Sequence, residues 1–425
     1  MKYAYRNATI LTGEKDMEPL QGMALLTSGD RIEAIVPDTG DVPGYETVDL
    51  QGKYLMPGLI NLHVHLPGSG KPSGTGDTKK LVKLLTSNAL FRKIVQLMCE
   101  GYAKTELMSG VTTLRTVGGV QEFDGLVRDR IARGEIPGPR ILAANMAVSV
   151  PGGHMAGSLA YEATSAEEAA AYTRRIADGG ADLIKLMITG GVLDATVKGE
   201  PGELKMPADY VKAACDAAHE RGLSVAAHVE SPEGVRVALE NGVDTIEHGA
   251  KPDEEILSLF RDRGAALVAT LSPALPYALF DRAVSGVSEM EQYNGEVVFR
   301  GIVDCAKACV EAGVPVGLGT DTGCPYITHY DMWREVNYFR KFCGVDGRFA
   351  LYTATLGNAQ IAGIDGETGS LAAGKCADML VLRRNPMEEL GTLRNPAMVI
   401  RAGTIYKNPK VKKMDKVEKE LDKFL

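Results

Sequence analysis

The chain has 425 residues, 45% hydrophobic and 24% charged, with a formal net charge of −8, as is typical of a globular protein with one large and one smaller domain. It contains no dense basic block, so we expect no nucleic-acid partner, and no apolar run is long enough to span a membrane. The N-terminal residues lack the apolar stretch of a signal peptide, and the seven cysteines are scattered and odd in number, which favours a cytoplasmic protein with reduced thiols.

The two ends of the chain have the pattern of β-structure. Short strands are predicted at residues 4–11, 22–27, 31–36 and 48–55, the last divided at Gly52, and again at 377–383 and 398–405. Because chain termini often lie close together, we expect residues 1–55 and 366–407 to form one small β-sandwich domain. The tail, residues 408–425, is charged and helix-prone, and a solvated or partner-docking helix is expected there.

Between these ends the pattern changes to strand, loop and helix, repeated. Apolar runs at 59–65, 111–116, 140–144, 181–188, 223–228, 243–247, 265–271 and 314–320 alternate with predicted helices, among them 81–108, 165–179, 207–221, 231–241 and 297–312. Eight such units predict an α/β fold, a (β/α)8 TIM barrel over residues 56–365. An open doubly wound sheet is the alternative, but no glycine-rich phosphate-binding turn supports it. The long loops 66–80 and 272–296 would lie over the barrel mouth, as lids, specificity loops or an oligomer contact.

Polar side chains stand at the ends of several of these apolar runs. His63 and His65 close the first run and, being two residues apart in a strand, point to the same side. The other members of this set are Lys185 inside the fourth run, His228 and His248 at the ends of the fifth and sixth, and Asp321 after the eighth. A barrel gathers the carboxyl ends of its strands at one rim, where imidazole and carboxylate groups suit Zn, Fe or Ni.

Lys185 lies in an otherwise apolar strand, where desolvation disfavours its charge. It could pair with an acid, form a Schiff base, or react with CO2 to give a carbamate. A carbamate is anionic and bidentate, as a carboxylate is, and could bridge two cations. With four histidines and an aspartate at the same rim, the carbamate is favoured, and the neutral amine that it requires is promoted by the same desolvation.

The chain resembles the amidohydrolase superfamily, in its binuclear branch with a carboxylated lysine. The resemblance is carried by Met56-Pro57-Gly58 and the run that follows to His65, by residues 110–115, and by residues 374–382. A narrower resemblance, to the imidazolonepropionase-like and prolidase-like (Xaa-Pro dipeptidase-like) group, is carried by residues 151–154, 184–193 and 246–249.

This resemblance implies a binuclear centre for hydrolysis of a C–N amide bond, peptidic, N-acyl or cyclic, in a small molecule. His63, His65 and Asp321 would hold the more buried of two divalent ions, expected to be zinc. His228 and His248 would hold the more exposed ion, and carboxylated Lys185 would bridge both. A hydroxide between the ions would be the nucleophile, the exposed ion would polarise the carbonyl, and Asp321 would be the catalytic base and then acid.

Five residues are candidates for substrate binding, and most have an alternative role. His154 would face the substrate's carbonyl or carboxylate, or be an ordinary loop histidine. Arg115 would bind a substrate carboxylate or belong to a buried ion pair. Tyr326 and His329 follow Asp321 and could line the pocket, although His329 could equally lie at the surface.

Glu230 is a departure from the prolidase-like pattern, in which a tyrosine shortly after the fifth-strand histidine holds the substrate's carboxylate. A glutamate there would repel a carboxylate, which favours a neutral or cationic substrate. Mononuclear ring-opening and deaminating relatives carry a glutamate close to this position, where it moves a ring nitrogen's proton. A mononuclear cyclic amidase or deaminase with Glu230 as proton shuttle is therefore the alternative, a non-catalytic scaffold is a remote one, and a homo-oligomer is compatible with either.

Overall fold

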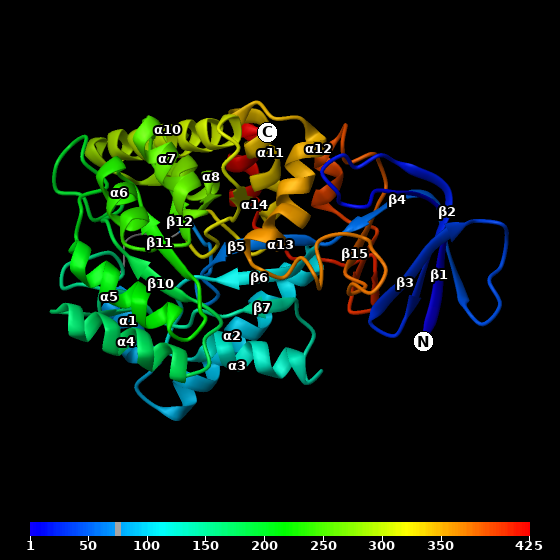
Figure 1. The fold of residues 1–425 in the computed structure, drawn as a ribbon, viewed down its shortest axis with the longest axis horizontal. Helices are drawn as coiled ribbons and strands as arrows, with labels where there is room; N and C mark the ends of the chain where they lie inside the picture. Colours follow the sequence, from blue (N-terminus) through cyan, green and yellow to red (C-terminus); the bar gives the residue numbers. More distant parts are fainter. Residues whose placement is uncertain (73–77) are drawn as a thin grey trace.

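The protein is described by a computed structural model that covers residues 1–72 and 78–425. Figure 1 shows a body of strands with helices on both sides, and beside it a separate sheet that carries the N-terminus. Residues 73–77 of the predicted loop 66–80 lie outside the described residues. None of the helices in the described part of the chain has the length and apolar character needed to cross a membrane.

Strands from both ends of the chain share one sheet, which confirms that the two ends build a common β unit. Its order among the described residues is β17-β16-β15-β4-β1-β2-β3, with β4 parallel to β1 and antiparallel to β15. The strands are β1 (Lys2–Ile10), β2 (Leu20–Ser28), β3 (Arg31–Pro37), β4 (Glu46–Pro57), β15 (Met379–Leu382), β16 (Met398–Arg401) and β17 (Thr404–Lys407). The arrangement of this unit as a two-layered sandwich stays a prediction.

Two strand predictions for this unit are corrected. Residues 46–57 form the single strand β4 and not a divided pair, because Gln51 (φ 54°) and Gly52 (φ 75°) form a bulge that shifts the register against β1 without ending the strand. Residues 398–405 are not one strand but the hairpin β16–β17, which turns at Ala402 and Gly403, both with positive φ.

The middle of the chain forms two sheets in which all the strand pairs are parallel. The first, in the order β5-β6-β7, contains β5 (Leu59–Val64), β6 (Val111–Thr116) and β7 (Arg140–Leu142). The second, in the order β14-β13-β12-β11-β10-β8-β9, contains β8 (Ala147–Ser149), β9 (Ala160–Glu162), β10 (Ile184–Met187), β11 (Val225–Val229), β12 (Thr245–His248), β13 (Ala266–Ala269) and β14 (Val316–Leu318). The α/β class with parallel strands is therefore confirmed, and the short strands β8 and β9 were not predicted.

Backbone hydrogen bonds cross between these two sheets at both ends. His63 O accepts from Asp321 N at 2.8 Å and His65 N donates to Thr322 O at 2.9 Å, so the carboxyl ends of β5 and β14 are joined. At the other end, Ala143 O accepts from Asp182 N at 2.8 Å. The first of these contacts brings two histidines and an aspartate together although more than half of the chain separates them.

Helices cover the parallel strands. They are α1 (Thr78–Leu85), α2 (Ala89–Met108), α3 (Phe123–Ala132), α4 (Ala166–Asp178), α5 (Ala208–His219), α6 (Pro232–Glu240), α7 (Glu254–Arg263), α8 (Leu271–Leu279), α9 (Arg282–Ser285), α10 (Glu289–Glu311), α11 (Met332–Cys343), α12 (Gly347–Tyr352), α13 (Asn358–Ile361) and α14 (Asp415–Leu421). The predicted helix 81–108 is two helices, because Asn88 caps α2 by accepting from Phe91 N. The predicted loop 272–296 is mostly helical, since Asp281 and Ser288 cap α9 and α10.

The C-terminal tail packs on its own chain and is not a solvated helix. Its helix α14 lies against α11, where the buried guanidinium of Arg334 pairs with Glu418 at 2.8 Å and Asp422 at 2.6 Å. Val417 and Leu421 on the same helix are buried. Some of the charged residues that led to the prediction of a solvated helix therefore form ion pairs within the chain.

Candidate metal centre

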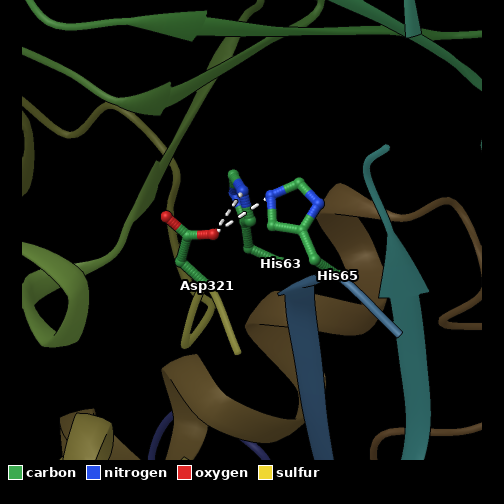
Figure 2. A group of neighbouring side chains, drawn as sticks. All are labelled: His63, His65 and Asp321. Carbon is green, nitrogen blue, oxygen red and sulfur yellow. Dashed lines mark ion pairs between the residues drawn. The ribbon is translucent and has the colours of Figure 1, made fainter. Parts of the chain in front are cut away.

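The first group of candidate ligands lies where β5 meets the segment after β14. Asp321 Oδ1 lies 3.5 Å from His63 Nε2 and 3.1 Å from His65 Nε2, as Figure 2 shows. One ligand atom from each residue lies within 4.8 Å of those of the other two, and all three residues are buried. Asp321 adopts a left-handed conformation (φ 54°), which aspartate tolerates better than most residues and which turns its carboxylate toward the histidines.

The far nitrogen of each histidine in this group has a fixed partner. His63 Nδ1 donates to Glu247 Oε2 at 2.7 Å, and His65 Nδ1 donates to the carbonyl oxygen of Gly118 at 2.7 Å. Burial lowers the pKa of His63 to about 4, so this ring is neutral at pH 7. Burial disfavours the charged ring of His65, but Asp321 and the carbonyl group of Gly118 raise its pKa. When both rings are neutral with the proton on Nδ1, each presents the lone pair of Nε2 toward Asp321, which is the tautomer that a metal ligand requires.

Glu247 is held in turn by Arg115. The guanidinium donates to Glu247 Oε1 at 2.6 Å, to Thr245 Oγ1 at 3.2 Å and to the carbonyl oxygen of Leu62 at 2.7 Å. Burial opposes ionisation of Glu247, but the charge of Arg115 and the hydrogen bond from His63 hold its pKa below the usual value. Of the two roles predicted for Arg115, these contacts are those of a buried ion pair, with the guanidinium fully engaged by the protein.

The second group comprises His228 from β11, His248 at the end of β12 and Glu230, whose ligand atoms also lie within 4.8 Å of one another. His248 Nδ1 donates to Thr270 Oγ1 at 2.6 Å, and His228 Nε2 donates to the carbonyl oxygen of Gly190 at 3.3 Å. Burial lowers the pKa of both histidines well below the usual value. The rings of His63 and His248 are 4.9 Å apart, so the two groups are neighbours.

Lys185 points into the same region from β10. Its side chain is buried, and its Nζ has no hydrogen-bond partner among the described residues. Burial lowers the pKa of the amine to about 8, and its charge in turn lowers the pKa values of His63, His228 and His248. The amine is therefore buried, unpaired among the described residues, and close enough to histidines of both groups to change their pKa values.

Three buried polar atoms in this region lack partners within the described residues: Lys185 Nζ, Asp321 Oδ1 and Glu230 Oε2. A buried polar group without a partner costs about 1–3 kcal/mol, so three in one place indicate a missing ligand. Neutral imidazoles together with carboxylates are the donor set that zinc and similar divalent ions prefer. The residues present therefore fit the metal centre that the resemblance implies.

His154 and Glu230 lie beside the second group. The His154 ring stacks on His228 with centroids 4.1 Å apart, and its Nδ1 donates to Asp194 Oδ2 at 2.5 Å. A Cβ placed on Gly191 would lie 3.4 Å from His154 and 3.5 Å from Glu230 Oε2, so both side chains flank this glycine. Burial, together with Asp321 and Asp194, raises the pKa of Glu230 well above the usual value.

Tyr326 and His329 are engaged in packing. The Tyr326 hydroxyl donates to the carbonyl oxygen of Val284 at 2.8 Å. His329 is buried, which excludes the surface position left open for it; its Nε2 donates to Gly68 O at 2.8 Å and its Nδ1 lies 3.3 Å from Glu106 Oε1. Their contacts give neither side chain a free polar atom directed at the two ligand groups, and substrate binding by these residues stays a prediction.

Sequence reasoning missed several supporting residues: Glu247, Thr270, Gly118 and Asp194. Glu247 stands in a strand directly before His248, and this placement of an acid in a buried strand was a usable signal. Thr270 and Gly118 contribute single atoms to histidines far along the chain, and no local pattern marks them. Asp194 comes directly after residues 184–193, which carry the narrower resemblance, but it lies outside that motif and was not predicted as a site residue.

Comparisons with known proteins agree with this architecture. Residues 54–406 match the sequence profile of the Amidohydrolase family. The chain superposes on a candidate prolidase from Bifidobacterium longum with 37% identity and a TM-score of 0.88, covering 99% of this chain and 98% of the other. It also superposes on a Xaa-Pro dipeptidase with bound methionine in its active site, with 27% identity, a TM-score of 0.84 and coverage of 96% and 100%. In sequence it is 25% identical to ochratoxinase from Aspergillus niger over 93% of this chain and 85% of the enzyme.

Proposed function

The chain belongs to the amidohydrolase family and is a hydrolase of carbon–nitrogen bonds, and on this premise we propose that it cleaves an amide bond in a small molecule with two divalent cations. The observation that carries the proposal is the adjacency of two histidine-containing ligand groups, 4.9 Å apart between the rings of His63 and His248, with the unpaired amine of Lys185 near both.

In this proposal His63, His65 and Asp321 would hold the more buried cation, His228 and His248 would hold the more exposed one, and Lys185, carboxylated by CO2, would be the ligand that the two cations share. Zinc suits this set of donors best. When bound, the cations polarise the substrate's carbonyl group and lower the pKa of water enough to supply a hydroxide nucleophile at neutral pH. The protein's own part is to fix the tautomer and orientation of the imidazoles through Glu247, Gly118 and Thr270, which accept from their Nδ1 atoms.

Asp321 is the proposed proton carrier. Burial opposes its ionisation, but the surrounding histidines, His63 first, hold its pKa well below the usual value. It therefore stands ready as a carboxylate to take a proton from the attacking water and to deliver it to the leaving amine. Its Oδ1 has no hydrogen-bond partner among the described residues, which leaves room for such a proton.

We propose a substrate that is neutral or cationic on the side facing Glu230. The similar proteins named a prolidase, a Xaa-Pro dipeptidase and an ochratoxinase support a peptidic or N-acyl amide. Arg115, the candidate anchor for a substrate carboxylate, is engaged with Glu247, whereas Glu230 and Asp194 place carboxyl groups beside His154. A cyclic amide remains compatible with this pocket.

The alternative function is a one-metal cyclic amidase or deaminase in which Glu230 moves a proton. The grouping of Glu230 with His228 and His248 favours it, because a carboxyl group so close to both imidazoles could act on a substrate nitrogen. The same grouping would allow Glu230 to be a ligand of the exposed cation. Metal stoichiometry separates these possibilities.

The test is metal analysis combined with a hydrolysis screen. Protein produced with added zinc and bicarbonate should contain close to two ions per chain and should hydrolyse at least one member of a panel of dipeptides, N-acyl amino acids, hydantoins, lactams and imidazolones. A chain that binds no metal under these conditions contradicts the proposal. A single ion per chain, together with an inactive Glu230→Gln variant, supports the alternative.

Lys185→Ala should lose at least the exposed ion and most activity, because the two sites then lack their shared ligand. The matched control is Lys212→Ala, which removes an exposed lysine paired with Asp216 and should change neither. Full activity in Lys185→Ala would exclude the bridging role.

We also propose that the parallel strands close into a (β/α)8 barrel, with residues 56–365 as the hydrolase domain. The hydrogen bonds between β5 and the segment after β14, and between the ends of β7 and β10, support closure. Residues 1–55 with 366–407 would be the β domain and 408–425 the tail. A cytoplasmic location stays a prediction.

A further inference from the structure

The loop after β10 ends in an aspartate that belongs to neither ligand group. Asp194 Oδ2 accepts from the backbone N–H of Gly191 at 2.9 Å and from His154 Nδ1 at 2.5 Å, and Asp194 N donates to the carbonyl oxygen of Gly191 at 3.0 Å. The hydrogen bonds and charge of His154 hold the pKa of Asp194 below its usual value, although burial opposes ionisation. The carboxylate is therefore fixed to the loop backbone and to one ring at the same oxygen.

The consequence for His154 is a single orientation and a single tautomer. Because a carboxylate only accepts, the nitrogen facing Asp194 must carry a proton. The plane of the His154 ring is fixed as well, because the ring stacks on His228 with centroids 4.1 Å apart and an inclination of only 5°. His154 Nε2 has no hydrogen bond within the part of the chain that the structure describes, and the side chain is 21% exposed, so Nε2 remains available to a ligand.

We infer that Asp194 is a positioning residue for the reaction: it sets the tautomer and the ring plane of His154 so that Nε2 meets the substrate next to the second ligand group. The expected effect on kcat rests on the proposed amide hydrolysis, whereas the expected effect on the tautomer of His154 does not.

The competing explanation is that Asp194 only shapes the loop 189–194. The two explanations differ in how the residues combine. If Asp194 acts through His154, removing Asp194 from a protein that already lacks His154 has no further effect on turnover. If Asp194 only shapes the loop, the two losses multiply, because independent sites contribute additively in free energy.

The experiment is a double-mutant cycle with Asp194→Ala, His154→Ala and the double variant, assayed on the best substrate from the screen. We expect each single variant to lose roughly 10–100-fold in kcat, as is typical when a partner of an active-site histidine is removed, and the double variant to lose no more than the His154→Ala variant. Metal content should stay at the wild-type value throughout. A double variant whose loss equals the product of the two single losses overturns the inference.

Asp194→Asn provides a second variant in case the alanine variant folds poorly. The amide removes the charge and can present either its oxygen or its NH2 group to His154, so it no longer fixes the tautomer of the ring. Its kcat should therefore fall at least as far as that of Asp194→Ala, with KM little changed, and an unchanged kcat in Asp194→Asn contradicts a role in positioning.

The chain offers a matched control pair, His219 and Asp244. His219 Nε2 donates to Asp244 Oδ2 at 2.9 Å, and the same carboxylate oxygen accepts from the backbone N–H of Val225 at 2.7 Å. Both side chains are more than 40% exposed, and they lie away from the ligand groups. Asp244→Ala should leave kcat at the wild-type value, alone or in combination with His154→Ala.

A spectroscopic readout separates this inference from the proposed function. In protein labelled with ¹⁵N-histidine, wild type should show a His154 ring with a protonated Nδ1, identified by the signals missing from His154→Ala, and Asp194→Ala should lose that protonated Nδ1 signature. An unchanged signature in Asp194→Ala overturns the inference even if no substrate is found. Failure of the whole screen, with the signature changed as expected, counts against the amide substrate and not against Asp194.

Discussion

The two ligand groups differ in how the protein holds them. In the first group, the Nδ1 atoms of His63 and His65 are bound by a buried acid and a backbone carbonyl, and the acid is fixed by Arg115. In the second group, His248 is held by one threonine hydroxyl and His228 by a carbonyl at 3.3 Å, with the one-fifth exposed His154 ring against it. The histidines of both groups stand on strands, but the first group is supported by Arg115 and Glu247 on strands β6 and β12, whereas Gly190, Thr270 and His154, which support the second, lie outside the strands.

This difference teaches that the two cations of the proposed centre have separate structural tasks. A site fixed by a charged buried network resists rearrangement, which suits a cation that stays in place and serves the nucleophile. A site framed by loop residues can adjust to a ligand, which suits the cation nearest the substrate. The comparison predicts that variants of the supporting residues affect one cation more than the other.

Asp321 belongs to the first group and should give the largest effect. Asp321→Asn removes both a ligand and the proton carrier, so kcat should fall by at least roughly 10²–10⁴-fold, the contribution of one positioned proton-transfer group. Steady-state kinetics with metal analysis tests this. If the Asp321→Asn variant kept its activity and its full metal content, Asp321 would be neither a required ligand nor the proton carrier, and the proposed difference between the two ligand groups would be contradicted.

Glu247 hydrogen-bonds only to a histidine of the first group, so its replacement should weaken binding of one cation more than that of the other. Glu247→Gln places an amide against either His63 or Arg115, and we expect affinity for the buried cation to fall roughly 10–100-fold while the exposed cation is retained. Competition with a chelator measures both affinities. The control is Glu255→Gln, which changes an exposed carboxylate of α7 paired with Arg236 and should alter neither affinity. Equal loss of both ions in Glu247→Gln would contradict the comparison.

Thr270 supports only the second group. Thr270→Val keeps the shape of the side chain but removes the acceptor for His248 Nδ1, so the exposed cation should bind about 10-fold more weakly, at the lower end of such effects. Calorimetric titration of the metal-free protein measures this affinity. Thr173→Val, a change of equally buried threonine in α4, should have no such effect. If Thr270→Val also lowered the affinity for the buried cation, the two ligand groups would not bind their cations independently.

The smallest expected effect concerns stability of the metal-free protein in acid. The pKa of His63 is about 4 in the folded protein and near its ordinary value of 6.5 when unfolded, so the unfolded state binds the extra proton first. Stability should therefore be lost as pH falls from about 6.5 to 4, by at most about 3 kcal/mol from this residue. Chemical denaturation across this range, compared with His63→Asn, measures the contribution. An identical pH dependence in both proteins would show that His63 is not held neutral.

Much of the fold and of the ligand set could be predicted because it is written in local patterns. The alternation of His63 and His65 in an apolar run, the placement of Lys185 within a strand, and that of His228, His248 and Asp321 at strand ends follow from strand periodicity and from the common rim of parallel strands. The structure brings His63, His65 and Asp321 into one group and His228 and His248 into another. Their roles as ligands stay predictions.

The strand predictions at Gly52 and at residues 398–405 failed on local bulge and turn geometry. The other failures concerned a contact between distant segments or a helix cap outside the apolar periodicity. Helices α9 and α10 begin at Asp281 and Ser288, which resemble ordinary loop residues in sequence, and His329 is buried against Glu106 and Gly68. No short window of sequence contains both partners of such contacts.

By itself, the sequence determined the alternation of strands and helices, the β-strands at both ends and the chemical types at the strand ends, because periodicity and residue type are local properties. Only the tertiary structure decided what surrounds those side chains. It pairs Arg115 with Glu247 across 132 positions and places Asp194 behind His154 across 40, because a hydrogen bond depends on distance in space and not on separation along the chain.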